Sequence, residues 1–287
     1  DGRHDDLLGG SASYFSVVAS MLAPVRMVAV VGEDFPEAHV ELFRARGVDT
    51  DGLQRVPGRT FRWSGRYLPD MVGRETLDTQ LNVFEQFQPV LSEAYRSTPF
   101  VFLANTHPAL QRQVLDQMER PRLVAMDTMN LWIDTAREGL EQVLPSVDVL
   151  LINDEEARML AGEHNLVRAA AAVRRMGPER LIIKRGDAGA MLFDDAGMFW
   201  APAYPVEQVV DPTGAGDSFA GGFVSYLAHL GDLSARSLRC AMIYGAAVAS
   251  CGVEGLSLDS LRGLQRAEIL QRCDAFGQLV RFDAITL

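Results

Sequence analysis

The chain has 287 residues, 48% of them hydrophobic and 23% charged, with a formal net charge of -11 at pH 7. This is the composition of a globular protein with room for one large α/β domain, and its acidity excludes sequence-independent nucleic-acid binding, which needs a basic surface. Three cysteines without a C-x-x-C pair, no signal peptide and no bilayer-length apolar stretch predict a cytoplasmic protein with no membrane partner.

Short β-branched runs alternate with helical patterns along most of the chain. A strand is predicted at 27–31 and an amphipathic helix at 36–46. Further strands are predicted at 100–104, 123–126, 147–152 and 181–184, with helices at 108–119, 133–143, 154–161 and 166–176. Continuous apolar runs suit strands buried on both faces. The pattern therefore predicts an α/β fold with a doubly wound, mostly parallel sheet flanked by helices, which binds ligands at the carboxyl ends of its strands.

One segment departs from this pattern. Residues 60–67 and 76–83 alternate apolar and polar side chains, which predicts a two-stranded ribbon outside the main sheet. An isolated pair of strands needs another surface to cover its apolar face. We interpret residues 56–84 as a β-lid that either packs on its own domain or pairs with a second copy in a homodimer. Residues 1–55 and 85–287 would then form the α/β domain.

The last third of the sequence begins with predicted antiparallel edge strands at 190–194 and 199–201. A strand-like run at 206–210 and helices at 215–230, 235–251 and 258–273 follow. Before the first of these helices, Gly214, Ala215 and Gly216 would expose backbone amides, and a helix amino terminus of this kind binds anions.

Asp217 stands beside this predicted anion site, where a carboxylate would repel a bound phosphate. In phosphoryl transfer, however, the acceptor hydroxyl must lose its proton as the new bond forms, and a carboxylate next to stabilising amides can accept that proton. The alternative interpretation is an acidic first-turn residue that only favours the helix dipole.

The segment Asp211-Pro212-Thr213-Gly214-Ala215-Gly216-Asp217-Ser218-Phe219 resembles the carboxyl-terminal signature of the ribokinase (PfkB) family of carbohydrate kinases. Four further segments resemble motifs of the family and occur in the family's order. The Gly-Gly motif corresponds to Gly9-Gly10, V-G-x-D to Val31-Gly32-Glu33-Asp34, N-x-x-E to Asn153-Asp154-Glu155-Glu156, and G-x-x-G to residues 184–189. The resemblance implies an enzyme that moves the γ-phosphate of ATP to a hydroxyl of a sugar or sugar-like substrate.

Position by position, the resemblance assigns Asp217 as catalytic base and the amides of Gly214, Ala215 and Gly216 as the anion hole. It implies that Glu156, with Asn153, organises Mg²⁺ through water. It places adenine near Gly186, Gly189, Ala247 and Gly252, and a monovalent cation such as K⁺ at Asp211. Lys184 is the only lysine and ends a predicted strand, so it contacts phosphate or, alternatively, snorkels to water.

On the substrate side, the resemblance places Gly9 and Gly10 against the substrate. Tyr14 stands where many relatives carry an Asn, which argues against ribose-type recognition. Arg62 would meet a phosphate or carboxylate from the lid, or face solvent. Asn105 and Asp127 follow predicted strands and therefore face the crevice. Two alternatives stay open: a nucleoside kinase that stacks a base on lid aromatic residues, and a catalytically silent binding protein on the same fold.

Overall fold

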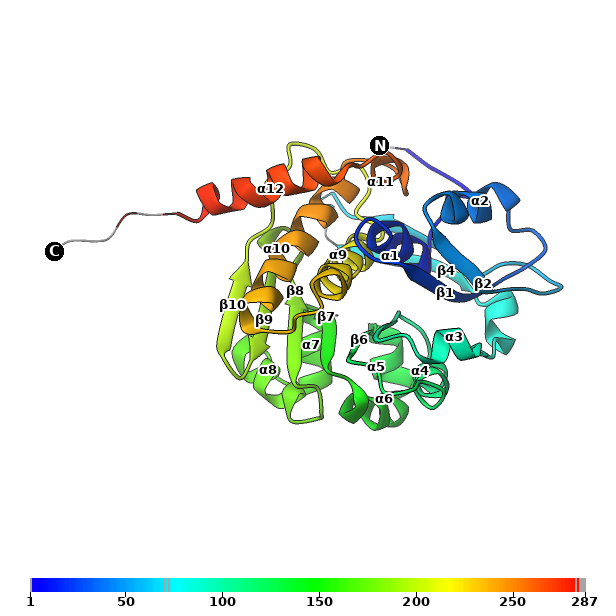
Figure 1. The fold of residues 1–287 in the computed structure, drawn as a ribbon, viewed down its shortest axis with the longest axis horizontal. Coiled ribbons are helices and arrows are strands. Elements are labelled where there is room, and N and C mark those ends of the chain that lie inside the picture. The colour runs from blue at the N-terminus through cyan, green and yellow to red at the C-terminus, as the bar shows by residue number, and fades with distance from the viewer. Residues whose placement is uncertain (1, 70, 72, 282, 284–287) are drawn as a thin grey trace.

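The computed structural model describes residues 2–69, 71, 73–281 and 283, and it is built around a sheet of six strands (Figure 1). The strands lie in the order β10-β9-β8-β7-β6-β5. Four of them are parallel: β5 (Phe100–Leu103), β6 (Leu123–Asp127), β7 (Val149–Asn153) and β8 (Arg180–Lys184). The hairpin of β9 (Ala190–Asp194) and β10 (Gly197–Ala201) adds two antiparallel strands at one edge. The predicted mostly parallel sheet is confirmed.

Helices cover both faces of this sheet. One layer contains α1 (Ser11–Ala19), α9 (Ala215–Leu230) and α10 (Ala235–Gly252), and the other contains α4 (Pro108–Leu115), α5 (Asn130–Thr135), α6 (Arg137–Val143), α7 (Asp154–Ala161) and α8 (Leu166–Arg174). Successive strand residues alternate between the two cores: Leu151 packs with the first layer, and Leu150 and Ile152 pack with the second. This alternation explains why the strands read as continuous apolar runs.

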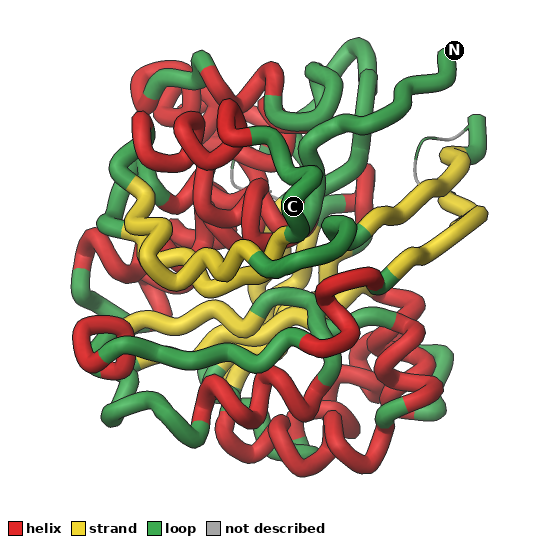
Figure 2. The backbone as a smooth tube through the Cα atoms, turned by 90° about the vertical axis from the view of Figure 1, so that its right-hand side faces the viewer, coloured by secondary structure: helices red, strands yellow, loops and turns green. Residues whose placement is uncertain are grey.

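Two small sheets accompany the main one. β1 (Val25–Val31) and β2 (Val48–Arg55) form a parallel pair joined through α2 (Glu37–Ala45). β3 (Arg62–Tyr67) and β4 (Arg74–Gln80) form the antiparallel ribbon that the alternating pattern predicted, and Figure 2 shows it extending away from the main sheet. β2 was not predicted, because its sequence VDTDGLQR contains no apolar run and most of its residues are only half-buried.

Several predicted boundaries need correction. Residues 206–210 form a loop because the amides of Val210 and Asp211 both donate to the carbonyl of Val253 rather than to a neighbouring strand. The helix predicted at 258–273 is two helices, α11 (Asp259–Arg262) and α12 (Arg266–Leu279), since a capping box between Gln265 and Glu268 starts a new one. The helix predicted at 133–143 is likewise divided between α5 and α6.

The remaining elements are short. They are η1 (Asn82–Gln86), α3 (Glu93–Arg96), η2 (Leu144–Ser146) and η3 (Gly186–Ala188). Within the described ranges, no helix combines the length and the apolar character that crossing a bilayer requires.

Candidate active site

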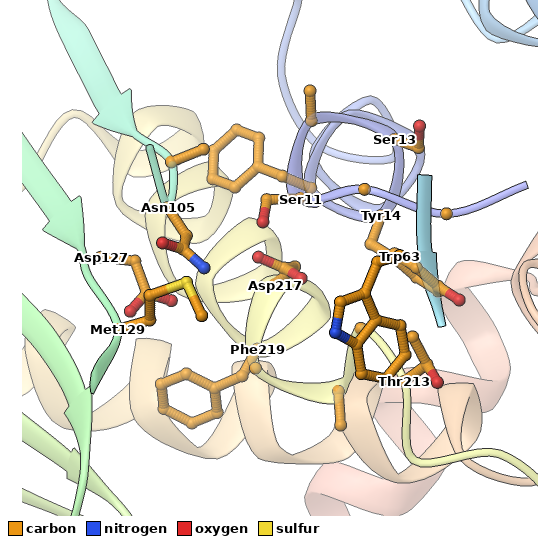
Figure 3. A pocket seen from close by; sticks show the side chains of 18 of the residues that line it. Ser11, Ser13, Tyr14, Trp63, Asn105, Asp127, Met129, Thr213, Asp217 and Phe219 are labelled. Atoms are coloured by element: carbon orange, nitrogen blue, oxygen red, sulfur yellow. The ribbon is translucent and has the colours of Figure 1, made fainter. Parts of the chain in front are cut away.

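The carboxyl ends of the four parallel strands place one polar residue each along the same edge of the sheet. Asn105 follows β5, and Asp127, Asn153 and Lys184 are the last residues of β6, β7 and β8. All four line one cavity together with the start of α9 and residues of the β3–β4 ribbon. Figure 3 shows Asn105, Asp127, Asp217 and Trp63 around it. The topology therefore assembles residues that are up to 79 positions apart in the sequence.

The start of α9 has the geometry of an anion site. Gly214 is its N-cap, with a left-handed φ of 74°, and a Cβ built there would lie 2.4 Å from ring atoms of Tyr14. Among the residues that the structure describes, no side chain caps the helix, and the amide of Ala215 donates to the carbonyl of Pro212 at 3.2 Å. Within the described residues, the amides of Gly214 and Gly216 have no hydrogen-bond acceptor, so they remain available to an anion.

Lys184, the only lysine of the sequence, places its ammonium group beside the first turn of α9. Its Nζ lies 2.9 Å from Oδ2 of Asp127, and a Cβ built on Gly216 would lie 3.0 Å from it. Burial opposes the charged form of Lys184, but the carboxylates of Asp127, Glu156 and Asp217 outweigh burial and raise its pKa. Lys184 therefore stays protonated in a setting that desolvates it.

The Asn153-x-x-Glu156 motif is a capping box of α7. Oδ1 of Asn153 accepts from the amide of Glu156, and Oε2 of Glu156 accepts from the amide of Asn153, each at 2.7 Å. Glu156 is only 4% exposed, so the reciprocal bonds hold a buried carboxylate in one orientation beside Lys184. The helix cap thus fixes the group that the resemblance connects with magnesium.

Asp211 connects the loop before α9 to the segment after α10. Its Oδ1 accepts from the amide of Thr213 and its Oδ2 accepts from the amide of Ser257, both at 2.9 Å. The residue is buried, with 9% exposure. These bonds give Asp211 a structural role, and its contact with a monovalent cation stays a prediction.

On the substrate side, Asn105 is held by a residue that the sequence did not single out. The indole Nε1 of Trp132 donates to Oδ1 of Asn105 at 3.1 Å, and Figure 3 shows the amide nitrogen on the side that faces Asp217. Because the acceptor atom is occupied, Asn105 presents N–H donors to the cavity. Gly9 and Gly10 are exposed at the cavity wall before α1.

Tyr14 lies deeper than expected for a substrate contact. It is 2% exposed, and its ring packs against Gly214. Burial, and after it the nearby carboxylates of Asp211 and Asp217, raise its pKa well above the ordinary range. Tyr14 therefore supports the α9 turn as a neutral phenol, and its direct contact with substrate stays a prediction.

The ribbon is attached to the rest of the chain at its base. Arg62 pairs with Asp6 and lies 3.7 Å from Asp34, whose Oδ1 accepts from both the amide and the hydroxyl of Thr60. The hydrogen bond from the hydroxyl of Thr60 is the main cause that lowers the pKa of Asp34. Arg62 therefore lies at the cavity wall but has two carboxylate partners already.

The chain matches the model of the pfkB family of carbohydrate kinases over residues 7–260. It belongs to this PfkB family. The chain is 28% identical to cytidine kinase of Thermococcus kodakarensis over 78% of its own length and 82% of that protein. It is 29% identical to 2-dehydro-3-deoxygluconokinase of Thermoproteus tenax over 76% of its own length and 72% of that protein. The PfkB chain is therefore an ATP-dependent kinase that acts on a sugar or nucleoside.

Solved structures support the fold of the PfkB domain. A putative ribokinase II from E. coli, in complex with ATP and Mg²⁺, superposes with a TM-score of 0.77 at 21% identity, covering 97% of this chain and 92% of the other. The nucleoside kinase of Methanocaldococcus jannaschii superposes with a TM-score of 0.75 at 18% identity, covering 96% of this chain and 92% of the other. At these identities the likeness shows the ribokinase fold alone.

Two of the positions expected near adenine require correction. Gly186 and Gly189 line the cavity, and their contact with adenine stays a prediction, but Ala247 and Gly252 do not line it. Ala247 is fully buried in the core, and Gly252 packs near Leu261. The period of α10 turns other residues toward the cavity. These are Ala246, Ala249 and Ser250, with Val253 directly after the helix.

Sequence reasoning about the PfkB site also missed two contacts. Trp132 was passed over because a single indole just before the helix predicted at 133–143 gives no signal of its own. The hydroxyl of Tyr67 lies 2.8 Å from that of Thr213, which joins the ribbon to the loop before α9. The ribbon and the Asp211-to-Phe219 signature were both recognised, but no pattern in either predicts that they meet.

Proposed function

We propose that this site transfers the γ-phosphate of ATP to a substrate hydroxyl with Asp217 as the base. Asp217 lies in the first turn of α9, one residue after Gly216 and within electrostatic reach of Lys184. As the hydroxyl oxygen forms its bond to the γ-phosphorus, its proton passes to the carboxylate of Asp217. The bond from the γ-phosphorus to the β–γ bridging oxygen breaks, and ADP leaves.

The proposed anion hole consists of the amides of Gly214 and Gly216 with the ammonium of Lys184, and the amide of Ala215 joins them only by giving up its 3.2 Å bond to the carbonyl of Pro212. Amide dipoles and a fixed cation stabilise the charge that develops on the moving phosphoryl group, and they do so most strongly where water is excluded. The single observation that carries this proposal is the juxtaposition of Asp217, the uncapped α9 terminus and Lys184 at one cavity. A silent binding protein would not need this base beside an anion site.

We propose that Glu156 and Asn153 hold Mg²⁺ through water. Oxygen donors fixed by a capping box fit a hard cation that keeps much of its hydration shell. In the described part of the chain, no group of three or more His, Cys, Asp or Glu side chains is placed to hold a metal ion directly. When bound, Mg²⁺ would neutralise charge on the phosphate oxygens. Asp211 is the proposed residue for K⁺.

The substrate is a sugar, a sugar acid or a nucleoside, and we propose that Gly9, Gly10 and Asn105 contact it. The N–H donors of Asn105 suit a carbonyl, carboxylate or hydroxyl acceptor. Trp63 points into the cavity from β3 in Figure 3, and its flat ring also suits stacking on a nucleobase. The names of the two relatives, a cytidine kinase and a sugar-acid kinase, match these two options.

We further propose that residues 56–84 act as a lid that excludes water when the substrate binds, and that their exposed apolar side pairs with a second copy. Leu77 and Leu68 of this segment are 57% and 38% exposed. An isolated pair of strands is marginally stable unless another surface covers its apolar side chains. The cysteines at 240, 251 and 273 are free thiols, which supports the proposed cytoplasmic location.

The test is ADP formation with ATP and Mg²⁺ across a panel of acceptors: cytidine and other nucleosides, 2-dehydro-3-deoxygluconate, fructose and ribose. We expect acceptor-dependent ADP release, with a phosphorylated product found by mass spectrometry. ADP release that no acceptor on the panel increases, or ATP binding without turnover on every acceptor, would contradict the proposal.

A further inference from the structure

A buried ion pair crosses over the end of β7. Lys184 ends β8 and Asp127 ends β6, and β7 lies between these two strands in the sheet. Their side chains are 18% and 7% exposed. Exposed ion pairs contribute little, but removing one partner of a buried pair leaves an uncompensated charge. The pair is therefore a fixed feature of the site and not a chance surface contact.

Asp127 lines the cavity, but its carboxylate is hydrogen-bonded within the chain. Oδ1 accepts from the amide of Thr128 at 2.8 Å, and Oδ2 accepts from Lys184 at 2.9 Å. Each carboxylate oxygen already accepts one hydrogen bond and the side chain is only 7% exposed, so a substrate hydroxyl has little access to this carboxylate. The group that Asp127 recognises is the ammonium of Lys184.

The position of that ammonium matters because of what lies beside it. A Cβ on Gly216 would stand 3.0 Å from Nζ of Lys184, so the ammonium lies directly against the first turn of α9. A lysine side chain has considerable rotamer freedom, which binding must otherwise restrict. Here the ion pair with Asp127 imposes that restriction. Since the chain has only this lysine, no other ammonium side chain can take its place.

We propose that Asp127 is a positioning residue that holds the Lys184 ammonium against Gly216, where the cation meets the phosphoryl group during transfer. This proposal rests on the phosphotransfer proposed above, and it replaces the substrate contact first expected for Asp127. Asp127 contributes no direct contact to the phosphate. Its effect on the reaction passes through the location of one cation.

A double-mutant cycle tests this. Asp127→Asn keeps an acceptor for the amide of Thr128 but removes the charge that holds Lys184. We expect it to lower kcat on the order of 10²-fold with little change in the KM of the acceptor, because a displaced transition-state contact lowers kcat. In a Lys184→Met background, the same change should alter kcat less than about threefold, since the group it positions is gone.

Asp148→Asn is the matched control. Asp148 is a half-buried carboxylate at the other end of the same sheet, and it accepts from the amide of Val124. We expect this control to leave kcat unchanged. If Asp127→Asn lowers kcat equally with and without Lys184, or raises mainly the acceptor KM, Asp127 acts independently of Lys184 and the proposal is wrong.

A measurement on the unaltered chain does not depend on how the variants fold. Labelling with ¹⁵N-lysine gives a single side-chain ammonium signal, provided that the expressed chain carries no added lysine. We expect a resolved signal at low temperature, because a buried ion pair slows proton exchange, and a shift on adding an ATP analogue with Mg²⁺. A signal lost to rapid exchange with and without nucleotide contradicts the fixed ammonium. Failure of the kinase function itself would appear differently, as no acceptor-dependent ADP from the unaltered chain.

Discussion

Two glycines in the α9 signature have separable roles, and alanine substitutions should distinguish them. Gly214 has a left-handed φ of 74°, and a Cβ there would lie 2.4 Å from three ring atoms of Tyr14. The left-handed conformation costs an L-residue about 1–2 kcal/mol, and overpacking a buried contact costs about 1–3 kcal/mol. Gly214→Ala should therefore lower the free energy of unfolding by roughly 2–5 kcal/mol.

Gly216 differs because it lies inside the first turn of α9 without a left-handed φ. Alanine in a helix is favoured over glycine by about 1 kcal/mol. The added methyl would stand 3.0 Å from Nζ of Lys184, so the ammonium must move by a few tenths of an ångström while it keeps its ion pair with Asp127. Gly216→Ala should therefore fold as well as the unaltered chain, while kcat falls on the order of 10²-fold because the ammonium is displaced.

The assay combines thermal unfolding of both variants with acceptor-dependent ADP formation. The expected pattern is a large loss of stability for Gly214→Ala, and a loss of kcat without loss of stability for Gly216→Ala. The reasoning is refuted if Gly216→Ala is as unstable as Gly214→Ala, or if it keeps the full kcat.

Two further predictions concern the substrate side and the sheet. Trp132→Phe removes the indole donor to Asn105, so the KM of the acceptor should rise severalfold while the KM of ATP stays unchanged; equal effects on both would contradict it. Burial, and after it the carboxylate of Glu179, raise the pKa of the Asp148 carboxyl above its ordinary value of 3.8. The native state therefore binds a proton at Asp148 more tightly than the unfolded chain does, and it loses stability as the pH rises through the raised pKa. Asp148→Asn should therefore stabilise the fold in neutral but not in strongly acidic buffer, as thermal unfolding at both pH values will show.

The sheet could be predicted because the burial of each strand leaves a pattern of apolar residues within the strand's own sequence. The continuous apolar runs at the positions of β5 to β8 suit only strands covered on both faces, and the alternation at β3 and β4 suits only a ribbon with one covered face. β2 escaped prediction because its polar sequence pairs through the backbone with β1, which no local pattern reveals.

The site was predicted residue by residue, but not as a set of contacts. Lys184 and Asp127 were each placed at a strand end, yet the ion pair between them depends on β6 and β8 flanking the same strand. Ala247 was placed at the cavity because small residues leave room for a flat base, but the helical period turns it into the core. Such errors arise where the side-chain direction, and not the residue type, decides.

The central claim is that Asp217 accepts the proton of the acceptor hydroxyl. The direct measurement is the kcat of Asp217→Asn with a productive acceptor, beside the Kd of ATP for the same variant and Asp148→Asn as the control. We predict that kcat falls by roughly 10²–10⁴-fold for Asp217→Asn, while ATP binding and the control stay close to the unaltered chain. A normal kcat in Asp217→Asn would contradict the assignment of the base and the mechanism built on it.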